Sequence, residues 1–273
     1  MSPHAVPDVV ARTVGDDPWV PVGDDPGGEG GSVDTAWRVG HHRVRRARAS
    51  VIEAEAVRLR WLADHAPCVD VVTVAAGPGG RPEDPALGWL VTTRPAGEPG
   101  DRAERHPRPV EVPAALGRAL RLLHRLDPDH CPFERRWDDT VADLAVAAEA
   151  GRIDQARLPA PYDRYPPTEL VAIARDQAPS AIDPVVGHGD ARPRNLHLAA
   201  GEIAAYLSVE RLGIADRHHD LAVAHRSVLD LYGAEAVVAF HEGYDLDVDL
   251  VRLDHYLLIA ALEAATGPDP EAT

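Results

Sequence analysis

The sequence predicts an α+β protein built in two lobes. Before residue 94, the short apolar runs Val69–Val74 and Trp89–Thr93 are separated by a Gly/Pro-rich turn and have the length of β-strands. Beyond it, apolar residues recur at spacings of three and four, the periodicity of packed helices. Arg94–Gly97 (RPAG) separates the two patterns, because Pro and Gly favour turns.

The first lobe is expected over residues 19–94, after a flexible leader over residues 1–18. Gly23–Gly31 (GDDPGGEGG) can continue neither a helix nor a strand, and it predicts a flexible loop. Ser50–His65 has an apolar helical face, and Ser50 is expected to cap this first helix.

The second lobe is expected over residues 95–273 and is mainly helical. The predicted helices are Val112–Leu126, Asp138–Ala150, Thr168–Gln177, Asp216–Leu231, Ala234–Gly243 and Val248–Ala265, and the predicted strands are Leu196–Leu198 and Ile203–Leu207.

The charge balance narrows the classes of partner. Asp and Glu number 44 against 28 for Lys plus Arg, a net charge of -16, and every one of the 28 is an arginine. Phosphate backbones and anionic membrane surfaces would be repelled, so we expect neither nucleic acid nor a membrane as partner. A cationic small molecule is compatible with this charge. The sequence shows neither a secretory signal nor an apolar run of about 20 residues, so we expect a cytoplasmic protein.

The most informative segment is His188-Gly189-Asp190-Ala-Arg-Pro-Arg-Asn195. An Asp followed five residues later by an Asn, on a loop that leads into a strand, suits phosphoryl transfer. The Asp can accept the proton of an attacking hydroxyl, and the Asn carbonyl oxygen can bind magnesium between phosphates.

This segment resembles the catalytic loop of the aminoglycoside phosphotransferases and of the related choline and homoserine kinases. Leu207–Ala222 (LSVERLGIADRHHDLA) is similar to the metal-binding turn and following helix of the aminoglycoside 3'-phosphotransferases. Glu55–Leu62 resembles the helix that supplies an ion-pair Glu, and Leu90–Gly97 resembles the adenine-binding hinge. The likeness spans about residues 19–262 and implies a two-lobed protein-kinase-like fold with a strand-rich N-lobe and a helical C-lobe.

The resemblance implies a phosphotransferase that uses ATP or GTP and Mg²⁺ on a hydroxyl of a small molecule, with antibiotic resistance as a plausible role. Asp190 would be the catalytic base, assisted by His188 and Arg211, while Asp220 would hold the loop from the helix beneath. Asn195 would bind magnesium. The nucleotide would contact Glu55, and the backbone near Thr92 and Arg94 would hold adenine.

Two departures affect the nucleotide site. Ser208 stands where the family has the Asp that chelates magnesium, and a hydroxyl is a poor substitute for a carboxylate. Glu210, two residues on, could supply the missing charge, or it could be a surface residue. The lysine that grips the phosphates cannot exist here, so the arginine alternatives Arg38, Arg43 and Arg45 stay open.

A third departure concerns the acceptor. Ala260 and Ala261 stand where the aminoglycoside enzymes have acidic residues, and a different tail, EAATGPDPEAT, follows. The identity of the substrate therefore stays open. The sequence also leaves open the choice of ATP or GTP and the oligomeric state.

Two other functions compete with a kinase. A pseudokinase of the same fold would bind a ligand without turnover, which Ser208 and the missing lysine favour. A metal-dependent hydrolase would need a histidine and aspartate cluster. The candidate residues for that cluster are His41, His42, His188, Asp190, His218, His219 and Asp220.

Overall fold

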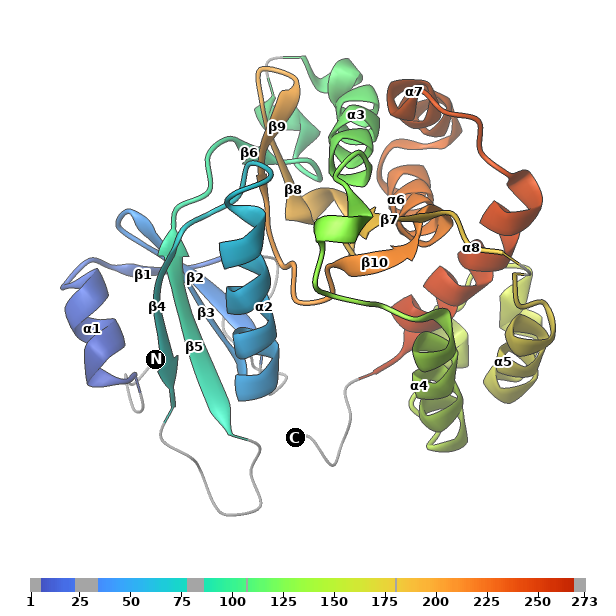
Figure 1. Ribbon diagram of the computed structural model, residues 1–273, viewed down its shortest axis with the longest axis horizontal. Coiled ribbons are helices and arrows are strands. Elements are labelled where there is room, and N and C mark those ends of the chain that lie inside the picture. Colours follow the sequence, from blue (N-terminus) through green and yellow to red (C-terminus); the bar gives the residue numbers. More distant parts are fainter. Residues whose placement is uncertain (1–5, 23–33, 78–85, 107, 180, 268–273) are drawn as a thin grey trace. The chain divides into compact units, whose positions relative to one another are not determined.

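The computed structural model describes residues 6–22, 34–77, 86–106, 108–179 and 181–267 (Figure 1). The chain forms two compact units. The first comprises the described residues up to Gly97 together with Ala204–Glu210, and the second comprises Glu98–Ile203 and the described residues from Arg211 onward. The glycine-rich segment Gly23–Gly31 lies outside the described residues; in the sequence it joins two strands that pair with each other.

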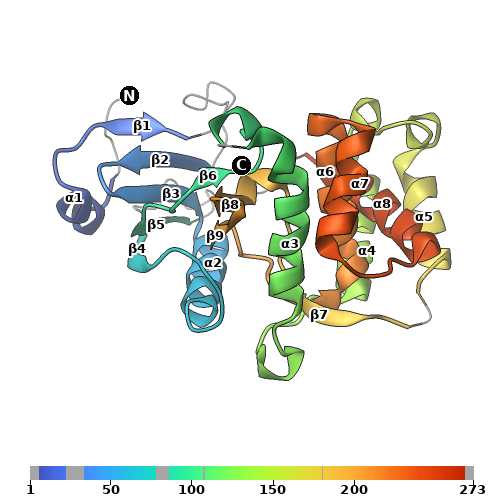
Figure 2. The ribbon, with the colours of Figure 1, turned by 90° about the horizontal axis from the view of Figure 1, so that it is seen from above.

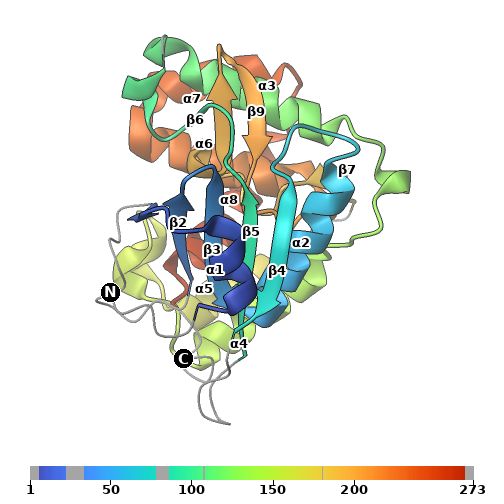
Figure 3. The ribbon, with the colours of Figure 1, turned by 90° about the vertical axis from the view of Figure 1, so that its left-hand side faces the viewer.

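The first unit is built on an antiparallel five-stranded sheet in the order β1-β2-β3-β5-β4 (Figure 2). Its strands are β1 (Trp19–Pro21), β2 (Thr35–Val39), β3 (His42–Arg48), β4 (Val71–Ala76) and β5 (Leu87–Thr93), and its helices are α1 (Asp8–Val14) and α2 (Ala49–Leu62). Figure 3 shows β2, β3, β5 and β4 of this sheet from another side. The two helices pack against opposite faces of the sheet, since adjacent strand residues point to opposite sides. Trp89 packs in the cluster that contains α1, whereas its neighbour Gly88 lies against Ala49 and Ile52 of α2.

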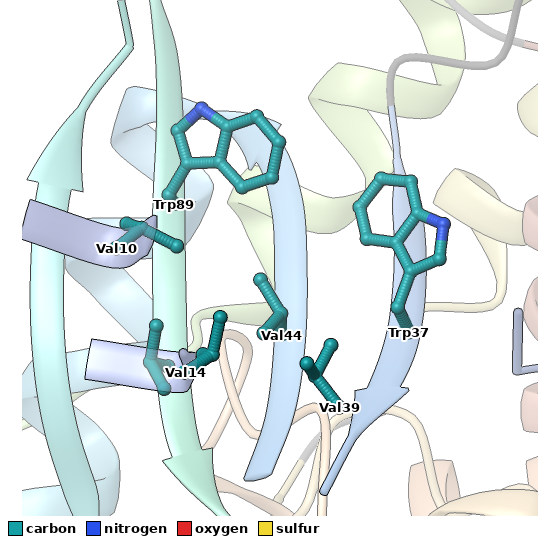
Figure 4. Close-up of a cluster of buried hydrophobic side chains, with 7 residues drawn as sticks. Val10, Val14, Trp37, Val39, Val44 and Trp89 are labelled. Carbon is teal, nitrogen blue, oxygen red and sulfur yellow. The ribbon is translucent and has the colours of Figure 1, made fainter. Parts of the chain in front are cut away.

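Helix α1 corrects the expectation of a leader over residues 1–18. Its Val10 and Val14 are buried and pack with Val39 and Val44 and with the stacked rings of Trp37 and Trp89 (Figure 4). Burial of these valines stabilises the helix on the sheet. Residues 8–14 are therefore part of the folded unit.

The start of α2 also differs from expectation. The N-cap residue is Arg48 rather than Ser50, and its side chain makes no capping hydrogen bond. The helix instead follows β3 directly, and the N–H of Ala49 donates to the carbonyl of Ala86 at 2.7 Å.

The second unit is mainly helical. Its α-helices are α3 (Val112–His124), α4 (Trp137–Glu149), α5 (Pro167–Asp176), α6 (Arg217–Tyr232), α7 (Ala234–Tyr244) and α8 (Leu250–Ala265). Strands β6 (Glu98–Pro99), β8 (Leu196–Ala199) and β9 (Glu202–Tyr206) form one sheet in that order, and β7 (Pro184–Gly187) pairs antiparallel with β10 (Gly213–Asp216). Short 3₁₀ helices are Ala103–Arg105, Pro109–Glu111, Pro128–His130, Gln155–Arg157, Tyr162–Arg164 and Pro193–Asn195. Among the described residues, no helix combines the length and apolar character needed to cross a bilayer.

Helices α3 and α7 lie side by side and touch through glycines (Figure 2). A side chain at Gly117 would overlap the carbonyl oxygen of Phe240, and one at Gly243 would overlap the backbone of Ala114. The two backbones therefore approach more closely than any side chain at these positions would allow. This contact positions α3, whose last residue, His124, lies 3.1 Å from Asp220 of α6.

We expect Gly117→Ala to lower the free energy of unfolding by about 1–3 kcal/mol, because the added methyl overpacks the α3–α7 contact. Urea unfolding measures the change. Gly267→Ala is the matched control, since its nearest neighbour across space is 3.4 Å from the added carbon. Equal unfolding midpoints for the two variants would contradict the close backbone contact.

Candidate active site

The loop that follows β7 arranges Asp190 and Asn195 as one unit. The Nδ2 of Asn195 donates to the Asp190 carboxylate at 3.0 Å and to the Asp190 carbonyl at 2.9 Å. The Nε of Arg192 donates to the other carboxylate oxygen at 2.5 Å. Because the amide nitrogen faces Asp190, the Asn195 carbonyl oxygen points away from it. The Asp190 carboxylate is thus held in one orientation while its side chain stays 19% exposed.

Asp220 holds this loop from α6. One carboxylate oxygen accepts the N–H of His188 at 2.5 Å, and the other accepts the N–H of Gly189 at 2.9 Å. Gly189 has a φ of +83° and lies against the backbone of Arg211, so no side chain fits there. The expected bracing by Asp220 is therefore seen. His188 is fully buried, and its Nδ1 accepts the N–H of Asp190 at 3.3 Å.

Further groups hold Asp220 from behind. The Nε2 of His124 lies 3.1 Å from Asp220, and the Nδ1 of the same ring lies 2.8 Å from the hydroxyl of Tyr244. Burial alone would raise the pKa of Asp220, but hydrogen bonds with His124 and His219 hold that pKa well below its usual range. Asp220 is therefore ionised in the folded protein, and its charge is spread over two backbone amides and two imidazoles.

We expect Asp220→Asn to lower the free energy of unfolding at pH 7 by about 3 kcal/mol, because a buried, hydrogen-bonded charge is removed from its partners. Since the folded-state pKa of Asp220 is depressed, its contribution is present above the unfolded value of about 3.9 and is lost as pH falls through the folded value. The difference between wild type and variant should therefore shrink in acid. Urea unfolding at several pH values tests this, and a difference that does not vary with pH would contradict it.

In the first unit, Arg45 binds Glu55. The Nη1 of Arg45 donates to the Glu55 carboxylate at 2.6 Å, and the two residues are 5% and 1% exposed. Arg38 of β2 is exposed to solvent. Burial lowers the pKa of Arg43, although the nearby charge of Glu55 acts to raise it. In the described part of the chain, Arg45 is the one of the three arginine alternatives that pairs with Glu55.

Glu210 and Asp34 also bind Arg45. Both Glu210 oxygens accept from the guanidinium at 3.0 Å, and Asp34 accepts at 2.9 and 2.5 Å. Burial would lower the pKa of Arg45, but the hydrogen bond to Asp34 and the charges of Glu55 and Glu210 raise it. The nearby carboxylate of Glu210 is thus engaged with an arginine.

Magnesium needs several oxygen ligands, with carboxylates among them. Asn195 offers one neutral oxygen, and Ser208, which is half-buried with a φ of +55°, offers a hydroxyl. The Glu210 carboxylate, which could have supplied the missing charge, is bound by Arg45. Of these three side chains only Glu210 carries a carboxylate, so the donors that they offer fit a magnesium ion poorly.

The hinge residues lie at the end of β5. Thr92 is 1% exposed, and its hydroxyl donates to the carbonyl of Arg43 at 3.5 Å. The N–H of Arg94 donates to the carbonyl of His41 at 2.8 Å. Binding of adenine through the Arg94 N–H would require exchange of this bond.

Arg211 belongs to a charge network that the sequence did not indicate. Glu263 of α8 accepts from Arg211, from Arg135 at 3.3 Å and from the Nε2 of His219 at 2.8 Å. Burial would raise the pKa of Glu263, but His219 and both arginines hold it well below its usual range. Arg135 and His219 also line a cavity of about 430 Å³, together with Tyr256. Ala260 and Ala261, the positions where the sequence lacks the expected acids, are buried, whereas the acidic residue of this helix end is Glu263.

The histidines do not form the metal cluster of a hydrolase. The Nδ1 of His218 binds Asp216 at 2.7 Å, and His219 binds Glu263. His41 and His42 belong to the first unit. Within the described ranges, no three His, Cys, Asp or Glu side chains are placed to hold a metal ion.

The first unit has a five-stranded antiparallel sheet and an Arg–Glu pair. The second unit is helical and has an Asp–Asn loop that Asp220 holds in place. This combination is that of a phosphotransferase of protein-kinase-like fold. The chain belongs to the phosphotransferase enzyme family, whose model matches residues 26–256. The predicted family and two-lobed fold are thereby confirmed.

Individual relatives agree with this membership. The chain is 33% identical over 227 residues to streptomycin 3''-kinase of Streptomyces griseus, covering 78% of this chain and 80% of the relative. It is 32% identical over 216 residues to an aminoglycoside 3'-phosphotransferase of Streptomyces fradiae, covering 76% and 78%.

Solved structures agree as well. The crystal structure of aminoglycoside-3'-phosphotransferase of type VIII has a TM-score of 0.76 and 31% identity, covering 90% of this chain and 93% of that chain. APH(3'')-Id of Streptomyces rimosus, in complex with ADP and streptomycin, has a TM-score of 0.74 and 25% identity, covering 93% and 95%.

Proposed function

We propose that this protein transfers a phosphoryl group from ATP or GTP to a hydroxyl of a small molecule. The observation that carries the proposal is the arrangement of Asp190, whose carboxylate is oriented by Asn195 and whose loop is fixed by Asp220. A carboxylate held in this way can orient an acceptor hydroxyl and take its proton as the new O–P bond forms and the bond to the leaving nucleotide diphosphate breaks.

The remaining roles follow from the contacts. His188 supports Asp190 through the N–H of that residue, and Arg211 is held by Glu263 beside Gly189. Arg45, paired with Glu55, is the cation that we assign to the nucleotide phosphates, with Arg43 and Arg38 as the remaining alternatives. Guanidinium groups suit phosphate because they donate in a fixed fork.

For the acceptor, the named activities of the relatives suggest an aminoglycoside or a similar polyhydroxylated cation such as streptomycin. Antibiotic resistance would then be the consequence of turnover. The acidic net charge of -16 favours a cationic acceptor over an anionic one. Ala260 and Ala261 are buried and carry no charge. The acceptor would therefore be held by groups other than those in the aminoglycoside enzymes, which have acidic residues at these positions.

A pseudokinase is the second candidate, and two observations favour it. Ser208 lacks the carboxylate expected at its position, and the guanidinium of Arg45 is bound by three carboxylates. In such a protein the same residues would bind a nucleotide weakly and no phosphoryl group would move. The preserved geometry at Asp190 and Asn195 argues for turnover.

We expect Asp190→Asn to reduce phosphoryl transfer at least about 100-fold, because the group that accepts the proton is neutralised. Transfer is measured with ATP and GTP against a panel of aminoglycosides that includes streptomycin, by mass of the product. Asp176→Asn is the control, since Asp176 is exposed at the end of α5. Nucleotide binding by the wild type without product from any acceptor would favour the pseudokinase.

Magnesium dependence gives a separate test. We expect magnesium to strengthen ATP binding at least about tenfold more in Ser208→Asp than in wild type, because the substitution adds the missing anionic oxygens. Ser208 has a φ of +55°, which Asp and Asn tolerate better than most residues, so Ser208→Asn is the uncharged control of matched shape. Calorimetric titration with and without magnesium measures both. If magnesium strengthened ATP binding equally in wild type and in Ser208→Asp, the expectation would be contradicted, and wild type would already bind the ion through other groups.

A further inference from the structure

The guanidinium of Arg45 has five N–H groups, and each one is in use. The Nε donates to Asp34, the Nη2 to Asp34 and Glu210, and the Nη1 to Glu210 and Glu55. Asp34 therefore binds one edge of the fork in a bidentate manner, and Glu210 binds the end. No donor of Arg45 is left for a phosphate oxygen unless a carboxylate leaves.

The carboxylates follow from the replacement of lysine by arginine. An ammonium group has three donors, whereas a buried guanidinium has five, and unsatisfied buried donors are costly. Glu55 alone satisfies one N–H of Arg45, and Asp34 and Glu210 satisfy the other four. Together with the buried guanidinium of Arg43, which interacts with the same groups, the three carboxylates and Arg45 carry a net charge of -1, which repels an incoming polyphosphate.

The three carboxylates differ in how readily they can leave. The Glu55 side chain is 1% exposed, and leaving Arg45 would strand its charge in the interior. The Asp34 side chain is 51% exposed and that of Glu210 is 20% exposed, so water can solvate either one after it separates from Arg45. Exchange with phosphate is therefore open to Asp34 and Glu210.

We propose that Asp34 and Glu210 compete with nucleotide phosphates for Arg45 and so set the nucleotide affinity of this protein. The inference rests on the proposed function, in which Arg45 is the phosphate ligand. Loss of an ordinary binding residue weakens the affinity for a ligand. Removal of the charge of Asp34 or Glu210 instead strengthens the affinity for phosphate.

The test is calorimetric titration of inorganic tripolyphosphate and of ATP into the whole protein, with magnesium removed by EDTA. We expect Asp34→Asn and Glu210→Gln each to bind tripolyphosphate about threefold more tightly than wild type, and the double variant about tenfold, as removal of a nearby negative charge predicts. Glu53→Gln is the matched control. It removes the same charge from an exposed position on α2, two residues from Glu55.

The proposal is overturned if Asp34→Asn and Glu210→Gln bind tripolyphosphate no more tightly than Glu53→Gln does. Each variant keeps an amide oxygen that can accept from Arg45, and a melting curve checks that each one is folded. Should Glu210→Gln fail to fold, Asp34→Asn decides, because Asp34 is half-exposed.

The two probes separate this proposal from the proposed function. Tripolyphosphate needs neither the hinge nor the catalytic loop, so a gain with this probe supports the competition even if ATP binds to no variant. In that case the ATP titration is repeated with magnesium, and if ATP still does not bind, only the assignment of nucleotide-dependent transfer fails. Conversely, a tripolyphosphate affinity that is the same in wild type and in all variants, together with measurable ATP binding, overturns the competition and leaves the proposed function intact.

Discussion

The carboxylate of Asp220 is the interaction on which the candidate site depends. It lies in the interior of the second unit, where an uncompensated charge would be very unfavourable. Four groups solvate it in place of water: the amides of His188 and Gly189 and the rings of His124 and His219. The backbone of the loop cannot move without leaving this charge exposed to apolar surroundings. The position of Asp190 is therefore a consequence of a buried ionic centre.

A different constraint acts on the first unit, where composition determines chemistry. A chain without lysine has to neutralise Glu55 with an arginine, and a guanidinium in a buried position requires more acceptors than an ammonium. Asp34 and Glu210 supply them. One change of residue type thus accounts for the conformation of the Glu210 side chain, which the sequence alone left open between a metal ligand and a surface residue.

The helical part of the fold could be predicted closely from apolar periodicity. The helix expected over Val112–Leu126 is found at Val112–His124, because its buried positions recur every three or four residues. Strand β3 was not predicted. Its sequence HRVRRAR has no apolar alternation, and its arginines are accommodated by carboxylates on one side and by the rings of Trp37 and Trp89 near Arg46 on the other. Such pairing is tertiary and leaves no local pattern.

The two units place different demands on catalysis. Asp190 is already oriented by Arg192 and Asn195, so it would require little reorganisation to act as the proposed base. Arg45 is already bound by carboxylates and must exchange partners before it can hold a phosphate. In the proposed reaction, the free energy of that exchange would be subtracted from the binding energy of the nucleotide, whereas the chemical step would keep its preorganised carboxylate. On this proposal, the departures from the family pattern would act first on nucleotide affinity and only second on the rate of transfer.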